Sequence, residues 1–279
     1  MNSPHGCTER AAIAEKPRFL IAAVSILVVA AGCATSPLGR EQLILFPDEE
    51  VDEMGATAYQ QLQASTPLNR NDAVNAYVDC VAGAITRTLE GEQGGPWEVR
   101  VFADDQVNAF ALPGRKIGVY QGLLSVAENQ DQLATVIAHE VAHVVAQHGN
   151  ERISTQFAAN AGLELLSALA GEPTRTKQLL FGLLGVGTQV GVLLPFSRTQ
   201  ESEADLLGLR LMAEAGFDPR GSVELWRNMI DAGGQTPPEF LSTHPSGESR
   251  IQALEAHMPE ALELAQAAHA SGANPDCGS

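Results

Sequence analysis

The order of hydrophobic and polar residues predicts a mostly helical chain. Over residues 72–89, apolar side chains recur at helical spacing behind Asn71 or Asp72, either of which can serve as the N-cap. Residues 48–63 are also expected to form a helix. The further helices expected from the sequence cover residues 122–128, 131–149, 150–170, 198–215, 218–232, 249–257 and 259–270.

One block of the chain has the pattern of strands instead. Short apolar runs occupy residues 97–102, 107–112 and 116–120, and turn-forming Asp, Pro and Gly separate them. Three short strands with helices on both sides in the sequence predict an α+β fold. We expect a mostly helical domain with a small three-stranded sheet beside the helix of residues 131–149.

The first apolar run is expected to be a targeting segment. Residues 19–32 follow Lys16 and Arg18, and about 14 residues are too few to span a bilayer, which needs about 20. The run ends in VVAAGC, which resembles the cleavage site of bacterial lipoproteins. We therefore expect residues 1–32 to be a signal peptide and residues 33–46 a tether carrying lipid on Cys33; an uncleaved anchor or a soluble secreted protein is the alternative.

A second apolar run covers residues 179–196. It only just reaches the length of a membrane span, and it contains four glycines, Thr188, Gln189 and Pro195. We expect a buried or cleft-covering segment; if part of it is exposed, its apolar face could instead hold unfolded polypeptides.

Charge narrows the choice of partners. The net charge of −17 becomes −18 when residues 1–32, with three basic and two acidic residues, are removed. Such an acidic protein is not expected to bind nucleic acid, or an anionic membrane by charge, so lipid is the expected tether. The remaining residues, 47–279, are enough for one domain with a sizeable core.

Two of the four cysteines remain after processing. The expected cleavage would remove Cys7 and the expected lipid would occupy Cys33, which leaves Cys80 and Cys277. In an oxidising compartment this pair is expected to form a disulfide; two unpaired thiols are the alternative.

The motif HEVAH, at residues 139–143, indicates a metal site. His139 and His143 lie one helical turn apart on the same face, so both imidazoles can reach a single ion. Glu140 projects beside them and can take a proton from water, as in zinc peptidases. The alternative is a buried helix with two histidines by chance. We expect one Zn²⁺ per chain, with Glu140 as the base.

A third protein ligand has to come from another part of the chain. The positions where the HExxHxxGxxH pattern has Gly and His hold Ala146 and Gly149, and His148 is expected on the opposite face as a last-turn histidine. Ser197 and Gln200 instead form a capping box that begins a helix with Glu201 in its first turn. The best candidate is therefore Glu201, with Asp205 one turn later to hold the outer N–H of a ligating histidine.

These segments resemble a known family. HEVAH, followed by SRTQESEAD and THPSGESR, is similar to the zinc metallopeptidases that include the HtpX-type and CAAX prenyl proteases, and the wider sequence resembles their bacterial periplasmic branch of LoiP and BepA type. The resemblance implies that His139, His143 and Glu201 bind zinc, that Glu140 is the base, and that the segment of His244 and Arg250 lies over the site.

Roles for this segment follow from the resemblance. Arg250 is the candidate to stabilise the oxyanion, and His244 to cover or modulate the metal; without the family pattern, they would be a surface histidine and a helix-face charge. The resemblance also places the strand Asn108–Pro113 along the cleft, with Asn108, Ala109 and Phe110 as the residues that bind substrate. As an edge strand it could pair with an extended substrate; an ordinary internal strand is the alternative.

The function expected from the sequence is that of a zinc endopeptidase in the bacterial cell envelope. Its substrates would be unfolded or misassembled envelope polypeptides, and Ala34 after Cys33 is expected to direct the lipoprotein to the outer membrane, facing the periplasm. The competing expectation is a latent protease that acts mainly as a chaperone or scaffold in outer-membrane protein quality control.

Overall fold

The computed structural model describes residues 33–170, 196–233, 240–241, 244 and 248–278. The predicted signal peptide and most of the apolar run of residues 179–196 lie outside these residues. Within the described residues, helices dominate and are joined by two small sheets, so the α+β prediction is confirmed. None of the described helices combines the length and the apolar character needed to cross a membrane.

Most of the expected helices form, with small shifts at their ends. The helices are α2 (Asp48–Ser65), α3 (Asp72–Thr86), α4 (Gln130–Val145), α5 (His148–Ala170), α7 (Arg198–Glu214), α8 (Gly221–Gly233) and α10 (Glu248–Ala270). Two short 3-10 helices are η1 (Gly91–Gln93) and η2 (Gln121–Ser125). The helix predicted over residues 122–128 is thus only the short η2.

The three predicted strands form one mixed sheet. β5 (Lys116–Tyr120) lies in the centre, parallel to β3 (Glu98–Phe102) and antiparallel to β4 (Ala109–Leu112). β4 is an edge strand of this sheet within the described residues. A separate hairpin of β1 (Cys33–Thr35) and β2 (Glu41–Leu43), which the sequence did not reveal, precedes α2.

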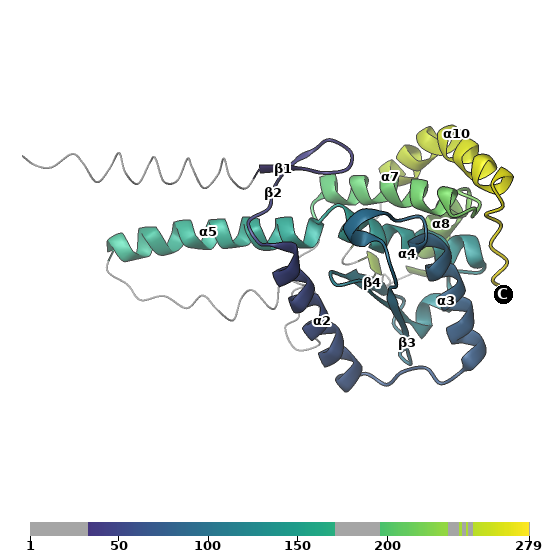
Figure 1. Cartoon of the computed structure of the whole chain (residues 1–279), viewed down its shortest axis with the longest axis horizontal. Coiled ribbons are helices and arrows are strands. Elements are labelled where there is room, and N and C mark those ends of the chain that lie inside the picture. Colours follow the sequence, from purple (N-terminus) through teal and green to yellow (C-terminus); the bar gives the residue numbers. More distant parts are fainter. Residues whose placement is uncertain (1–32, 171–195, 234–239, 242–243, 245–247, 279) are drawn as a thin grey trace, which may run out of the picture.

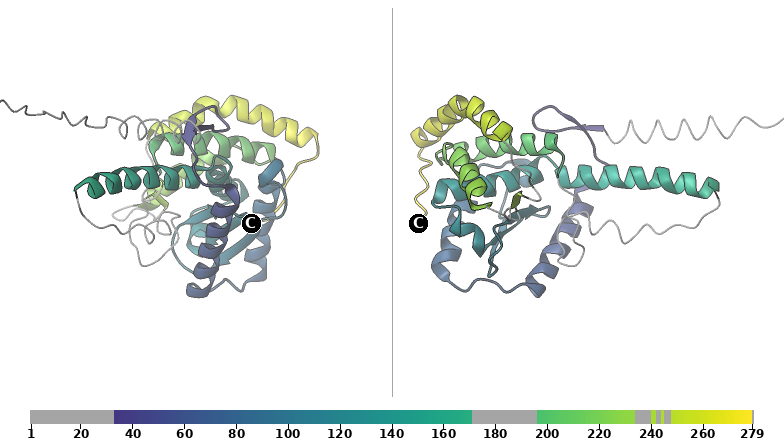
Figure 2. Two further views of the ribbon diagram at one scale, coloured as in Figure 1. Left: turned by 60° about the vertical axis from the view of Figure 1, so that its left-hand side comes forward. Right: turned by 180° about the vertical axis from the view of Figure 1, so that it is seen from behind.

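The helix with the HEVAH motif lies at the centre of the fold. Every residue from Gln132 to Val144 is buried, because α4 packs against α3, α7, α8 and β4. Figure 1 shows α4 enclosed by these elements, whereas α5 extends away from them, as both views of Figure 2 also show. Asn129 caps α4 and accepts hydrogen bonds from the N–H groups of Asp131 and Gln132.

Two predicted helix boundaries were wrong. α4 does not continue to Gly149: it ends at Val145, Gln147 adopts φ 55°, and His148 begins α5. At the other end of the chain, the two predicted terminal helices are one, because α10 continues through Pro259. Leu254 and Ala261 are buried on either side of Pro259, and this packing outweighs the lost backbone hydrogen bond.

Two features hold the other elements against α4. Gly208 of α7 lies so close to α4 that an added Cβ would be 2.9 Å from the backbone nitrogen of His139. Cys80 of α3 forms a disulfide with Cys277, and the N–H of Cys277 donates to Oε1 of Gln130 at the start of α4. The two helices that matter most for the site are thus in backbone contact.

Candidate metal centre

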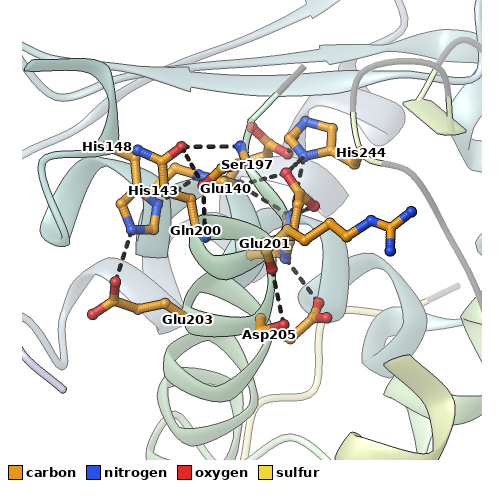
Figure 3. Close-up of polar contacts among 12 residues, drawn as sticks. Glu140, His143, His148, Ser197, Gln200, Glu201, Glu203, Asp205 and His244 are labelled. Carbon is orange, nitrogen blue, oxygen red and sulfur yellow. Dashed lines mark hydrogen bonds and ion pairs between the residues drawn. The ribbon is translucent and has the colours of Figure 1, made fainter. Parts of the chain in front are cut away.

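Four buried side chains from three parts of the chain converge at one point. His139 and His143 come from α4, Glu201 from the first turn of α7, and His244 from the segment before α10. One possible ligand atom from each lies within 4.8 Å of the others. Figure 3 shows Glu201 and His244 pointing toward each other in this cluster.

The beginning of α7 places Glu201. The predicted capping box is present, because the N–H of Gln200 donates to Oγ of Ser197, and the N–H of Ser197 donates to Oε1 of Gln200. The helix therefore begins at Arg198, and Glu201 faces α4 from its first turn. Its carboxylate oxygens lie 3.6 Å from Nε2 of His139 and from Nε2 of His143.

The chemistry of the cluster suits a metal cation. The Nε2 atoms of His139 and His143 are 3.2 Å apart and share the space with a carboxylate, a donor set of nitrogen and oxygen that Zn²⁺ prefers. Burial lowers the pKa of His143 well below its usual range, which keeps the imidazole neutral and able to ligate. The residues present therefore fit a bound divalent metal.

The carboxylates around His139 favour positive charge at this position. Burial alone would lower the pKa of His139, but contacts with Asp205 and Glu201 raise it to about 9. Oδ1 of Asp205 lies 3.2 Å from Nδ1 of His139, on the side of the ring away from the cluster. This is the outer-sphere position that the sequence suggested for Asp205.

Arg250 contacts the carboxylates of both Asp205 and Glu201. Its Nε donates to Oδ2 of Asp205 at 2.7 Å, and its Nη1 lies 3.1 Å from Oε2 of Glu201. The guanidinium also lies over the ring of Trp226, 3.8 Å from the ring centroid. Burial opposes ionisation of Asp205, but Arg250 and His139 together outweigh it and hold the pKa of Asp205 below its usual range. The oxyanion role of Arg250 stays a prediction; its visible contacts are those of a positioning residue.

Glu140 lies beside the four converging side chains and contacts a different set of neighbours. The side chain is buried, and burial raises the pKa of its carboxyl group. Its Oε1 makes no hydrogen bond to any described residue, and Nε2 of His244 is 3.4 Å away. The backbone of Ala111 in β4 offsets part of this rise in the pKa of Glu140, so the carboxylate is influenced by the sheet edge. Glu140 is thus free to take part in chemistry next to the four converging groups.

His148 lies where sequence analysis did not place it. Because the chain turns at Gln147, His148 is fully buried and its Nδ1 lies 2.8 Å from Nδ1 of His143. Its Nε2 lies 3.2 Å from Oε2 of Glu203. His148 and Glu203 were not part of the site predicted from the sequence. Helical spacing extended beyond the end of α4 placed His148 on the opposite face of the helix. Its contact is with the outer nitrogen of His143, so it is not one of the converging ligand atoms.

A cavity of about 240 Å³ reaches the site along β4 and the beginning of α2. His143, Arg152 and Phe196 form part of its wall. From the strand segment, Ala111 and Leu112 line it, and the predicted contacts Asn108, Ala109 and Phe110 do not. Phe110 instead packs among Tyr59, Phe102 and Tyr120. The cavity therefore lies along the second half of the strand Asn108–Pro113 that was expected to border the cleft.

The remaining predicted residues lie apart from the cluster. Cys33 is exposed in β1, and the lipid attachment expected there stays a prediction. Cys80 and Cys277, the pair expected from the cysteine count, are joined in a disulfide.

Comparisons with known proteins agree with a peptidase site. The family model described as peptidase family M48 matches residues 67–258. The mitochondrial metalloendopeptidase OMA1 of Schizosaccharomyces pombe is 41% identical over 167 residues, which cover 59% of this chain and 48% of that protein. For the OMA1 protein of Arabidopsis thaliana, the identity is 40% over 177 residues, 63% of this chain and 34% of that protein.

A bacterial relative covers more of the chain at lower identity. The beta-barrel assembly-enhancing protease of Escherichia coli strain K12 is 29% identical over 207 residues, 71% of this chain and 42% of that protein. The chain spans about half the length, or less, of these curated relatives.

Proposed function

Because the chain belongs to peptidase family M48, we propose that it is a zinc-dependent endopeptidase, with His139, His143 and Glu201 as its metal ligands and Glu140 as its general base. The observation that carries the proposal is the convergence of two buried imidazoles and one buried carboxylate, with a second buried carboxylate beside them. A merely structural zinc site would have no use for that second carboxylate.

The residues divide the chemistry between them. When bound, a zinc ion supplies a Lewis acid that lowers the pKa of water and polarises a peptide carbonyl. Glu140 accepts the proton of the attacking water and passes it to the leaving amine, and its raised pKa makes it a stronger base than an exposed glutamate. Asp205 holds the proton on Nδ1 of His139, so that Nε2 of the ring offers its lone pair to the cluster.

The substrate is proposed to be an extended polypeptide. The cavity next to His143 is bordered by the edge strand β4, whose outer backbone groups can pair with a peptide, as in β-strand addition. Ala111 and Leu112 line this cavity, and the backbone of Ala111 also lowers the pKa of Glu140, against the effect of burial. A peptide held there would run past the base. Unfolded chains supply such extended segments, whereas folded proteins do not.

The cell compartment is part of the proposal. We infer a lipid-anchored protein of the bacterial outer membrane, in the periplasmic LoiP and BepA branch, that cleaves unfolded or misassembled envelope proteins. The cleavage-site pattern before Cys33, the disulfide of Cys80 with Cys277 and the similarity to a beta-barrel assembly-enhancing protease support it. The OMA1 relatives are mitochondrial by name, so the compartment needs its own test. Mass spectrometry of the mature N-terminus should find lipid on Cys33; an intact Met1 or a free Cys33 thiol would contradict it.

A second candidate function rests on His244. This histidine reaches the same cluster as the three proposed ligands and lies 3.4 Å from Glu140, so it can occupy the place that water needs. A protein resting in this state would be a latent protease that acts mainly as a chaperone or scaffold.

Casein cleavage by the purified protein distinguishes the two functions. The endopeptidase proposal expects zinc near one per chain, cleavage that a chelator stops, and recovery when zinc is added back. Full zinc content with no cleavage under any condition would favour the chaperone or scaffold.

A further inference from the structure

The two histidines of α4 are supported in different ways. Nδ1 of His139 faces the carboxylate of Asp205, a common arrangement for a metal-binding histidine. Nδ1 of His143 faces a second imidazole instead, that of His148, at 2.8 Å. Nε2 of His148 lies 3.2 Å from Oε2 of Glu203. Figure 3 shows Glu203 next to the ring of His148. The carboxylate of Glu203 therefore does not contact His143 directly but acts on it through the ring of His148.

The proton positions along this chain of contacts follow from the metal-binding nitrogen. If Nε2 of His143 offers its lone pair to a metal, its Nδ1 carries the proton and donates to Nδ1 of His148. Nδ1 of His148 is then an acceptor, which puts the second proton on its Nε2, where the ionised Glu203 accepts it. Each donor meets an acceptor, so the tautomers of both rings depend on Glu203 remaining charged and in place.

The N-terminal arm, residues 33–43, holds Glu203. The hydroxyl of Ser36 donates to Oε1 of Glu203, and Nε of Arg40 donates to Oε2 at 2.8 Å. Ser36, Glu203 and His148 are buried, so water cannot easily replace these contacts. Removing Arg40 would leave a buried carboxylate without its cation, which is much more costly than losing an exposed ion pair.

Arg40 also ties the arm to both helices that flank the site. Its two terminal nitrogens donate to Glu151 of α5 at 2.6 and 2.7 Å. Glu151 in turn accepts from Nε2 of Gln200, the residue that closes the capping box of α7. Through Glu151, one guanidinium therefore connects the arm, the first turn of α5 and the start of α7, which carries Glu201.

We propose that Ser36 and Arg40 are positioning residues for the metal ligand His143, acting through Glu203 and His148. The inference rests on the proposed function in that His143 is taken as a ligand. It adds that the segment next to Cys33 is part of the scaffold of the metal centre, so that displacement of the arm loosens the metal. The tether and the site are then coupled.

The test compares zinc release from the full mature chain and its variants into a chromogenic chelator. Arg40→Met removes the charge at similar length, and His148→Phe keeps a ring without nitrogens. Each should speed zinc release about 10-fold or more, the range for lost outer-sphere partners. Because the contacts run in series, the double variant should release zinc no faster than His148→Phe alone. Arg40→Lys keeps a positive charge beside Glu203, so its zinc release should be slower than that of Arg40→Met.

The control is Arg227→Met, which breaks an exposed ion pair with Glu255 and should leave zinc release unchanged. Thermal unfolding of the metal-free proteins is measured alongside. Zinc release from Arg40→Met at the wild-type rate would overturn the inference, as would effects of Arg40→Met and His148→Phe that multiply in the double variant. A wild-type protein that binds no zinc would instead overturn the proposed function, so the two failures are distinguishable.

Discussion

His244 is 2.9 Å from Glu201, measured from Nδ1 of the ring to Oε1 of the carboxylate. A histidine from outside the two central helices thus touches a proposed metal ligand, and its Nε2 faces the proposed base Glu140. A fourth protein ligand on a catalytic zinc takes the position that water and substrate need. His244 itself therefore has the position of a gate on the site.

Replacing His244 tests this gate. His244→Ala should raise the rate of casein cleavage, because the position that the imidazole covers becomes open to water, while the three remaining ligands retain zinc. Cleavage rate and zinc content are measured on the same preparation. If both fall together, His244 holds the metal and does not gate it.

Glu201 and Asp205 of α7 are expected to differ in their effect on zinc. Glu201→Ala removes a ligand and should abolish stoichiometric binding, whereas Asp205→Ala removes only the partner of His139 and should weaken affinity about 10- to 100-fold. Titration of the metal-free variants with zinc gives both values. Full zinc binding by Glu201→Ala, with loss in Glu203→Ala, would mean that the wrong carboxylate was assigned.

Gly208 tests the contact between α4 and α7. Alanine is favoured over glycine inside a helix by about 1 kcal/mol, which alone predicts a more stable protein. At Gly208, however, the new Cβ would meet the backbone of His139 at 2.9 Å, so α7 must move away from α4 and carry Glu201 with it. Gly208→Ala should therefore lower both the urea midpoint and the affinity for zinc.

A matched glycine serves as the control for this substitution. Gly83 lies inside α3, where an added Cβ would meet only the flexible side chain of Arg87, at 3.1 Å. Gly83→Ala should keep zinc affinity unchanged. Equal behaviour of the two alanine variants would contradict the close approach of α7 to α4.

The disulfide is expected to contribute to stability. It joins residues 197 positions apart, and closing such a loop stabilises a folded protein by up to about 5 kcal/mol in the chain-entropy model. Replacing both Cys80 and Cys277 by Ser should lower the free energy of unfolding in urea by a value up to this limit. Two thiols that react with an alkylating reagent in native, unreduced protein would show that the bond does not form.

Local signals in the sequence predicted much of the site. The position of His148 could not be predicted, because the chain changes direction just before it. His139, Glu140 and His143 follow from spacing within one helix, and Glu201 follows from the capping box of Ser197. His148 could not be placed, because only the left-handed backbone of Gln147, a residue with no strong preference for it, turns the ring back toward His143.

The contribution of the N-terminal arm was also beyond the sequence. Ser36 and Arg40 meet Glu203 across more than 160 residues, and no periodic pattern records such a contact. Pro259 shows the opposite case, where a strong local signal for a break is overridden by packing on both sides. Long-range packing decides such positions.

The central claim, that Glu140 is the base of a zinc endopeptidase, is tested most directly by Glu140→Gln. The amide keeps the size of the side chain but cannot accept a proton from water, whereas the ligand atoms of His139, His143 and Glu201 are untouched. The measurement is zinc content and casein cleavage on one preparation. Our account predicts about one zinc per chain in both proteins and a rate lower by orders of magnitude in the variant; cleavage near the wild-type rate with zinc bound would contradict it.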